Sequence, residues 1–252
     1  MSSVAGRPGG PPRAPTTAPM TRRRGVALCD ADAVTWREGN DTTGGMASGD
    51  SRDPELEALR SHVDLTGLSP LARTVTERII LASADPGYAQ DLVCANGWLE
   101  AAAGVLAEGA PIVADGPMTL AGISGDALIC KAGQSLTERL ARTAAISRPA
   151  AAVRLAHGEA GPGAVWVVGS EPLAIYEILS RGVQPALVIA LPAGFVTAVD
   201  AKEVLRDSGL PALTNLSCKG GPAVAAAACQ ALLDLANAGQ QAPADPGLAA
   251  RR

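Results

Sequence analysis

The residues best placed to do chemistry in this 252-residue chain stand in short turns that follow apolar, strand-like segments. Asp115-Gly116-Pro117-Met118 is one such turn, and Gly169-Ser170-Glu171-Pro172 is another. Two more are Pro192-Ala193-Gly194-Phe195 and Ser217-Cys218-Lys219-Gly220-Gly221-Pro222. Glycine lets a backbone approach a ligand closely, so we expect the four turns to form one binding edge.

Positive charges near these turns predict an anionic ligand. Lys219-Gly220-Gly221 sets a cation beside backbone N–H groups just before a helix, which suits a carboxylate or a phosphate. Ser170 is expected to cap the next helix, with Pro172 in its first turn, although both motifs are also ordinary turn chemistry. Arg78 and Arg148 stand among apolar neighbours, so each either pairs internally or binds an anion.

Several other chemistries find no support in the sequence. The only histidines, His62 and His157, stand at helix ends, where surface positions are expected. The cysteines are scattered, with no C-x-x-C pair, so we expect free thiols and no metal site: Cys29, Cys94, Cys130, Cys218 and Cys229. No G-x-G-x-x-G or Walker A pattern is present, so no nucleotide cofactor is predicted.

Composition narrows the partners further. A net charge of −4 argues against a dedicated nucleic-acid or anionic-membrane binder. Only 2% of the residues are aromatic, too few for recognition by repeated ring stacking, while the 47% that are hydrophobic suffice for a large core. No apolar run approaches the roughly 18 residues of a membrane span, and no export signal is recognisable, so a cytoplasmic location is expected.

The chain divides into one domain with two tails. Residues 1–50 are rich in Gly, Pro, Ser, Thr and Arg without apolar periodicity, and we expect them to be disordered. Residues 239–252 are expected to form a flexible tail. The folded unit is therefore predicted at 52–238, a single domain by size.

Within 52–238, helical and strand patterns alternate. The strand-like segments are short, apolar and rich in β-branched residues: 111–114, 127–131, 165–168, 186–191 and 212–215. Helical spacing is expected at 56–63, 70–82, 91–108, 135–157, 171–181, 198–208 and 223–237. This alternation predicts an α/β fold, a three-layer doubly wound and mostly parallel sheet, in which ligands bind beyond the carboxyl ends of the strands.

In combination, these motifs resemble the precorrin-8X methylmutase family, cobalt-precorrin-8 methylmutases included. The similarity spans about residues 54–236 and depends on the order and spacing of several segments. They are Glu77-Arg78-Ile79-Ile80, Ala84-Asp85-Pro86-Gly87-Tyr88-Ala89, residues 109–115 with Met118 and Gly122, residues 147–151, residues 168–172, residues 191–196, Lys202 and Lys219-Gly220-Gly221.

The resemblance implies an isomerase of cobalamin biosynthesis that moves a methyl group between two ring carbons of a tetrapyrrole. It implies a homodimer with the substrate between the subunits, and no cofactor. Because the substrate carries many carboxylates, the resemblance gives Arg78, Arg148 and Lys219 a role in binding. It extends the substrate-binding set to Asp115, Met118, Gly122, Gly169, Ser170, Pro192, Gly194, Phe195, Gly220 and Gly221.

The sequence departs from the family pattern at the expected proton donor. Members carry a histidine three residues after the arginine that matches Arg78, thought to protonate the macrocycle, and here that position is Leu81. Leucine cannot transfer a proton, which leaves Asp85 and Glu77 as substitute donors. In addition, Cys218 replaces an arginine, and Glu171 adds a negative charge.

Three hypotheses follow from these departures. The first is a methylmutase-type isomerase that is slow or uses a substitute acid. The second is a catalytically silent paralogue that binds a corrinoid or partners an active methylmutase. The third is a fold reused for another small anionic ligand, which Glu171 and the missing arginine favour.

Overall fold

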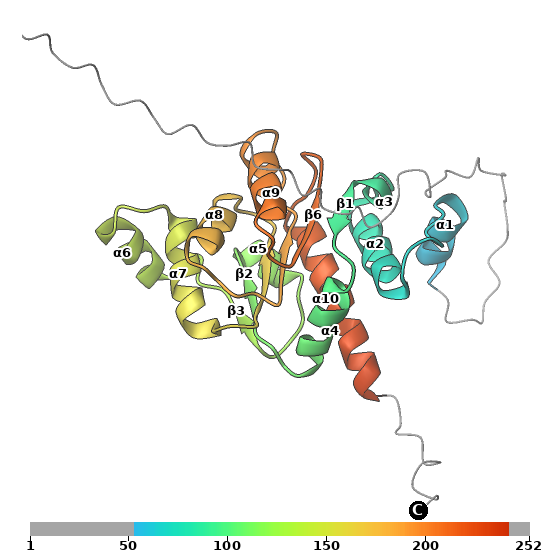
Figure 1. The fold of residues 1–252 in the computed structure, drawn as a ribbon, viewed down its shortest axis with the longest axis horizontal. Coiled ribbons are helices and arrows are strands. Elements are labelled where there is room, and N and C mark those ends of the chain that lie inside the picture. The colour runs from blue at the N-terminus through green and yellow to red at the C-terminus, as the bar shows by residue number, and fades with distance from the viewer. Residues whose placement is uncertain (1–52, 242–252) are drawn as a thin grey trace, which may run out of the picture.

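The computed structural model describes residues 53–241, which form a six-stranded sheet with helices on both faces (Figure 1). The strands are β1 (Leu92–Cys94), β2 (Ile112–Ala114), β3 (Leu128–Ile129), β4 (Val165–Val168), β5 (Leu187–Ala190) and β6 (Ala212–Asn215). Their order in space is β1-β6-β5-β4-β2-β3, and only the β1–β6 pair is antiparallel. The predicted three-layer, mostly parallel α/β sheet is confirmed.

Helices cover the two faces of this sheet. They are α1 (Pro54–His62), α2 (Pro70–Ser83), α3 (Tyr88–Asp91), α4 (Trp98–Ala107), α5 (Pro117–Ala121), α6 (Ser135–Thr143), α7 (Arg148–Ala160), α8 (Leu173–Ser180), α9 (Thr197–Asp207) and α10 (Pro222–Gln241). Helices α2, α4 and α10 pack on one face, and α7, α8 and α9 pack on the other. Ser69 and Ser147 cap α2 and α7, each with a proline in the first turn.

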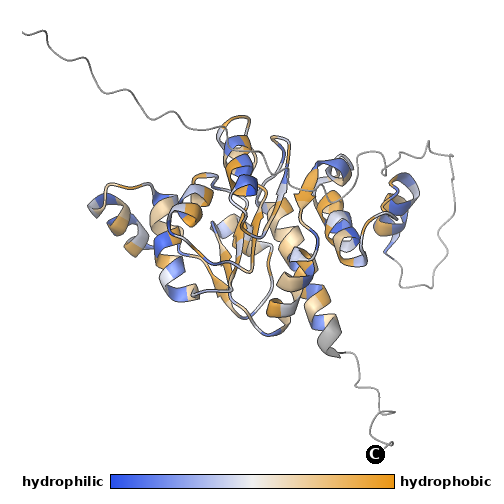
Figure 2. Ribbon diagram, viewed as in Figure 1, coloured by the Kyte–Doolittle hydropathy of each residue, from blue (hydrophilic) through white to orange (hydrophobic). Residues whose placement is uncertain are grey.

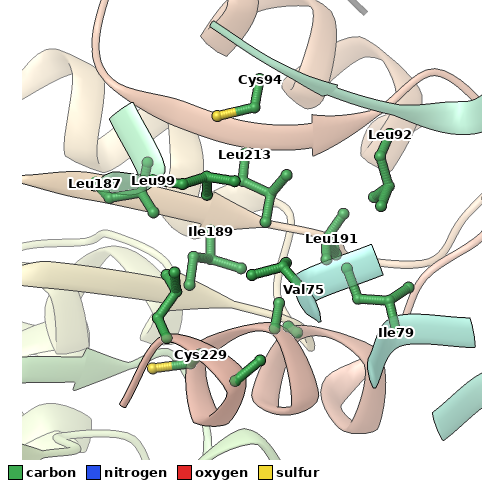
Figure 3. Close-up of a cluster of buried hydrophobic side chains, with 14 of the residues drawn as sticks. Val75, Ile79, Leu92, Cys94, Leu99, Leu187, Ile189, Leu191, Leu213 and Cys229 are labelled. Carbon is green, nitrogen blue, oxygen red and sulfur yellow. The ribbon is translucent and has the colours of Figure 1, made fainter. Parts of the chain in front are cut away.

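Each central strand feeds two separate cores, because successive side chains point to opposite faces. On β4, Val165 and Val167 face the α2/α4/α10 core, whereas Trp166 and Val168 face the α7/α8/α9 core. Figure 2 shows largely hydrophobic strands in the middle of the domain, and helices in which hydrophobic and hydrophilic residues alternate. Figure 3 shows the first core, in which side chains of β5, β6 and the residue after β5 pack with Val75 of α2 and Cys229 of α10: Leu187, Ile189, Leu213 and Leu191.

Two predicted helices are wrong in the structure. The segment predicted as one helix over 91–108 contains β1, a turn at Gly97 with a φ of +85°, and then α4. The segment predicted as one helix over 135–157 is divided into α6 and α7, because Ala145 adopts a φ of +50° and Ser147 starts a new helix. Short strands and alanine-rich turns share composition with helices, so periodicity alone does not separate them.

The expected disorder of residues 1–50 lies outside the described residues. The tail predicted at 239–252 also lies outside them, except that the backbone of α10 continues to Gln241. Within residues 53–241, no helix combines the length and apolar character needed to cross a membrane.

Candidate functional site

Four neighbouring parallel strands, β2, β4, β5 and β6, end at the same edge of the sheet. The four turns predicted to form a binding edge therefore do lie next to one another. We call this set of loops the rim, and it consists of residues 115–118, 169–172, 191–196 and 216–221. The rim is the place where an open parallel sheet ordinarily binds its ligand.

Asp115 is buried in the rim, and its carboxylate is bonded within the protein. Its Oδ2 accepts hydrogen bonds from the backbone N–H groups of Gly169, Ser170 and Glu171 at 3.1, 2.7 and 2.7 Å. Its Oδ1 accepts one from Thr119 Oγ1 at 2.7 Å. The anion-binding turn after β4 is thus occupied by the chain's own carboxylate, which positions this loop.

The prediction that Ser170 caps the next helix is wrong. Helix α8 begins at Leu173, two residues later than the predicted start, and no side chain caps it. Instead, Ser170 Oγ lies 3.2 Å from Thr119 Oγ1, so the hydroxyl joins the Asp115 cluster.

Backbone hydrogen bonds join the neighbouring rim loops directly. The N–H of Gly221 donates to the carbonyl of Leu191 at 2.7 Å, and the N–H of Gly194 donates to that of Cys218 at 2.9 Å. Gly220 has a φ of +147°, and a Cβ there would lie 2.1 Å from the Leu191 carbonyl oxygen. Only glycine fits at that position, and the Gly221 N–H expected to face a ligand is used within the rim.

Lys219 is paired with one of the proposed substitute acids. Its Nζ lies 2.8 Å from Asp85 Oδ2 and 5.2 Å from the centre of the Tyr88 ring. The hydrogen bond from Lys219 lowers the pKa of Asp85 against the smaller opposing effect of burial. Asp85 is therefore a charged carboxylate at neutral pH, which makes it a poor general acid.

A cleft of about 350 Å³ between α2 and α10 contains three of the predicted site residues, Arg78, Leu81 and Gly122. Its other walls are Ala82, Ala223, Ala226, Ala227, Gln230 and Ala231. A Cβ on Gly122 would lie 2.7 Å from that of Ala226, so glycine permits this helix contact. Of the described residues that line the cleft, Arg78 alone is charged, and none beside Leu81 could replace a histidine as acid.

Arg78 is more exposed than its apolar neighbours suggested. Its side chain is 54% exposed and pairs loosely with Asp234 of α10, at 3.4 Å. Asp234 also accepts a hydrogen bond from Gln230, whose Oε1 accepts the N–H of Ser124. This series of bonds, from Ser124 through Gln230 and Asp234 to Arg78, thus borders one side of the Leu81 cleft.

Arg148 lines a different cleft, of about 260 Å³, with Glu138, Ala141, Arg142 and Ile146. Its side chain is 75% exposed and lies 3.4 Å from Glu138. Arg148 begins α7, whereas Arg78 belongs to α2, and these two helices cover opposite faces of the sheet. The structure therefore does not bring Arg78 and Arg148 into one cleft.

Glu77, the second substitute acid, lines a different cleft, with Arg60 and Arg73, and does not line the Leu81 cleft. It is 3% exposed and accepts two hydrogen bonds from Arg60 of α1, from Nε at 2.7 Å and from Nη2 at 2.9 Å. This geometry docks α1 onto α2 and gives Glu77 a structural role.

We predict that Glu77→Gln lowers the free energy of unfolding by about 1–3 kcal/mol, because the buried carboxylate loses its charge and one of the two hydrogen bonds that it accepts from the half-exposed Arg60. Urea denaturation measures this change, with Glu108→Gln on the exposed end of α4 as the control, expected within about 0.5 kcal/mol of the unmodified chain. Loss of ligand binding without loss of stability would instead place Glu77 in the site.

Large apolar side chains are exposed on three of the rim loops. Met118 is 72% exposed, Phe195 is 89%, Val196 is 69% and Leu216 is 52%. Pro192 and Gly194 belong to the loop that carries Phe195, and Gly194 has a φ of +151°. Such a concentration of exposed apolar side chains marks an interaction surface.

A buried polar group beneath the rim was not predicted as a site. Lys202 of α9, fully buried, donates to Asn215 Oδ1 at 2.8 Å, and Asn215 donates to Asp91 Oδ2 at 2.8 Å. Burial lowers the pKa of Lys202 to about 8, although Asp91 opposes this. Asp91 was missed because it fell in a segment wrongly predicted as helix. The one signal in the sequence was the polar residue Asn215 at the end of the last apolar strand.

Among residues 53–241, no three His, Cys, Asp or Glu side chains lie close enough to hold a metal ion. The described cysteines are free, and burial raises the pKa of two of them, Cys94 and Cys229, to about 12. Cys218 is half-buried in the rim, and Cys29 lies outside the described residues.

Doubly wound α/β domains with a polar rim at the carboxyl ends of their strands form a class of enzyme and ligand-binding domains. The model of the precorrin-8X methylmutase family matches residues 53–235, so this chain belongs to that family. The family match covers the whole sheet and both clefts.

Individual relatives agree with this assignment. The cobalt-precorrin-8 methylmutase of Methanocaldococcus jannaschii is 34% identical over 157 residues, covering 61% of this chain and 74% of the relative. The cobalt-precorrin-8 methylmutase of Salmonella typhimurium is 34% identical over 172 residues, which cover 66% of this chain and 82% of the relative. The crystal structure of the precorrin-8X methylmutase from Thermus thermophilus superposes with a TM-score of 0.62 at 31% identity. The superposition covers 69% of this chain and 90% of the Thermus thermophilus chain.

Proposed function

We propose that this chain is a precorrin-8X methylmutase-like isomerase of cobalamin biosynthesis, which acts on an acid-bearing tetrapyrrole. The observation that carries the proposal is the family match over residues 53–235, joined to a cleft in which Arg78 stands beside the family's histidine position, Leu81. The reaction moves a methyl group from one ring carbon to another, so it needs binding, orientation and a proton donor, and no redox cofactor.

The substrate carboxylates would be bound by the cations of the rim and its flanks. Arg78 and Arg148 belong to helices on opposite faces of the sheet, and Pro149, next to Arg148, lines the same small cavity as Asp115 and Val168. The two arginines line separate clefts, so one ligand that reaches both would have to extend from one face of the sheet to the other. A flat macrocycle with acidic side chains on its edge meets that requirement, and guanidinium groups bind carboxylates well.

We propose further that two copies of the chain form a homodimer with the substrate between them. The exposed side chains of Met118, Phe195, Val196 and Leu216 support this arrangement, because a second copy would cover them and close the open side of the rim. A cytoplasmic location is part of the same proposal, supported by the free thiols of the described residues.

The test is to incubate the purified chain with precorrin-8X and follow the change in its absorption spectrum. Titration with the product, hydrogenobyrinate, measures binding separately, and sedimentation equilibrium gives the oligomeric state. The proposal expects saturable binding and a dimer. If the absorption change does not exceed that in buffer alone, the isomerase function is rejected. If hydrogenobyrinate does not bind, a tetrapyrrole ligand is rejected as well.

A second candidate function is favoured by the lining of the Leu81 cleft. With no proton donor in that lining, the chain would bind a corrinoid without converting it, or would partner an active methylmutase. Normal hydrogenobyrinate affinity without turnover is the result expected of this candidate. The exposed Glu171 favours a third outcome, in which the chain binds another small anion and not hydrogenobyrinate. That result would contradict both the isomerase and the corrinoid-binding candidate.

We predict that Asp85→Asn strengthens hydrogenobyrinate binding about two- to fivefold, because Lys219 is then free to pair with a substrate carboxylate. The free energy of unfolding should change by less than about 1 kcal/mol, since the pair is more than a third exposed. Fluorescence titration at pH 7 measures the affinity, with Asp126→Asn as the exposed control. Weaker binding in Asp85→Asn would mean that Asp85 itself orients Lys219 for the ligand.

A further inference from the structure

A buried pair of opposite charges lies beneath the rim loop of residues 216–221. Lys202 is fully buried, and its Nζ donates to the backbone carbonyls of Ser217 and Lys219 at 2.6 and 3.1 Å, besides Asn215 Oδ1. The single ammonium group therefore binds two carbonyls of the same loop. A buried lysine is costly unless its donors are satisfied, and here three acceptors satisfy them.

Asp91 of α3 holds the same loop through its N–H groups. Its Oδ1 accepts from the backbone of Leu216 at 3.0 Å and of Ser217 at 2.8 Å, and its Oδ2 accepts from Asn215 Nδ2 and Ser217 Oγ. Asn215 thus bridges the two charges with its amide. Lys202 thus fixes two carbonyl groups of this loop, and Asp91 fixes two of its N–H groups.

This arrangement decides which backbone groups the loop presents on its other side. In a trans peptide the N–H points opposite to the preceding carbonyl, and the described residues contain no cis peptide. Because the Ser217 and Lys219 carbonyls point to Lys202, the N–H groups of Cys218 and Gly220 point away from it. Within residues 53–241, neither of these N–H groups donates a hydrogen bond.

We infer that Lys202, with Asp91 and Asn215, is a positioning residue that holds the N–H groups of Cys218 and Gly220 toward a bound carboxylate, beside the Lys219 ammonium. Two N–H groups flanking a cation form a compact site for one carboxylate. The N–H groups of Cys218 and Gly220 take the role that was expected of the Gly221 N–H, which donates to the Leu191 carbonyl instead. The identity of the carboxylate rests on the proposed function, whereas the hold on the loop does not.

The charge of Lys202 offers a readout that a purely structural role would lack. Burial lowers its pKa to about 8; Asp91 of α3 and Cys218 of the loop raise it, and Arg206 of α9 lowers it. As the pH rises through about 8, the ammonium loses its charge and one N–H donor. The hydrogen bonds to the Ser217 and Lys219 carbonyls weaken, and the amide shifts of the loop change.

The matched variants are Lys202→Met and Arg206→Met. Arg206 is a second cation on α9 and is half-buried, but it donates to Thr214 Oγ1 and the Asn215 carbonyl of β6 and not to residues 216–221. Nuclear magnetic resonance of the full chain follows amide exchange at Ser217, Lys219 and Gly221, and the amide shifts of Gly220 and Gly221 between pH 6.5 and 9.5. Cys218→Ser removes the loop's thiol and keeps Lys202 intact.

In Lys202→Met we expect exchange at these amides to be at least tenfold faster, against less than threefold in Arg206→Met. The Gly220 and Gly221 shifts should titrate near pH 8 in the unmodified chain and in Cys218→Ser, and stay flat in Lys202→Met. Hydrogenobyrinate affinity should fall tenfold or more in Lys202→Met and stay unchanged in Arg206→Met. If Lys202→Met does not fold, Ser217→Ala, which removes one bond to Asp91, should show a three- to tenfold faster exchange.

Equal exchange rates in Lys202→Met and Arg206→Met would overturn the inference. Failure of the unmodified chain to bind hydrogenobyrinate would overturn the proposed function instead, because the exchange and shift measurements need no ligand. Binding that is unchanged in Lys202→Met despite a loosened loop would remove the carboxylate site and leave only the hold on the loop.

Discussion

Replacing Leu81 by histidine is expected to raise the rate of methyl migration about 10²–10⁴-fold, the usual contribution of a general acid. Leu81 lines the cleft one turn of α2 after Arg78, and histidine is close to leucine in size, so the ring would enter the cleft without displacing its alanine walls. Single-turnover absorption kinetics with precorrin-8X measure the gain.

Leu81→Gln is the matched control for this experiment. Glutamine brings a polar group of similar size but no proton that it can transfer near neutral pH, so its rate should remain at that of the unmodified chain. If Leu81→His binds hydrogenobyrinate normally yet turns over no faster, the cleft no longer aligns the macrocycle, and the silent, corrinoid-binding function is the better one.

Asp115→Ala is expected to lower the free energy of unfolding by about 3 kcal/mol or more, which would be the largest stability effect among the rim residues considered. The substitution removes the acceptor for the N–H groups of Gly169, Ser170 and Glu171 and for the Thr119 hydroxyl. Each buried polar group left unpaired costs about 1–3 kcal/mol. Urea denaturation followed by circular dichroism gives the value.

Asp126→Ala, an exposed acidic residue before β3, is the control and should stay within about 0.5 kcal/mol of the unmodified chain. Asp115→Asn should fall between the two, because its amide keeps one acceptor oxygen but directs N–H donors toward others. A stable Asp115→Ala chain that fails only in ligand binding would return Asp115 to the substrate-binding residues.

The sheet was largely predictable because its central strands are buried on both faces. Val165–Val168 and Leu187–Ala190 are continuous apolar segments, which is how a strand inside a three-layer fold differs from an amphipathic one. The outer strand Leu92–Cys94 was missed, because three apolar residues next to a true helix fit that helix's pattern as well. Its register depends on pairing with β6, which is a tertiary contact.

The site was predictable in its location but less so in its bonds. The sequence placed Asp115, Gly169 and Lys219 at neighbouring strand ends, and the strand order confirms this. It could not indicate that Asp115 bonds to the loop after Gly169, or that Lys219 meets Asp85, since both partners come from other segments. Arg78 was expected among apolar residues, but its side chain points to the helix surface beside Asp234.

The two outermost strands, β1 and β3, contain three and two residues. A neighbouring chain that tried to extend the sheet would gain only a few ladder hydrogen bonds at either margin, too little to outweigh the entropy of ordering another strand. Fibril-like stacking is thereby discouraged by the architecture itself. In the proposed homodimer, self-association would use the rim surface around Phe195, and a closed pair of that kind would not propagate into a polymer.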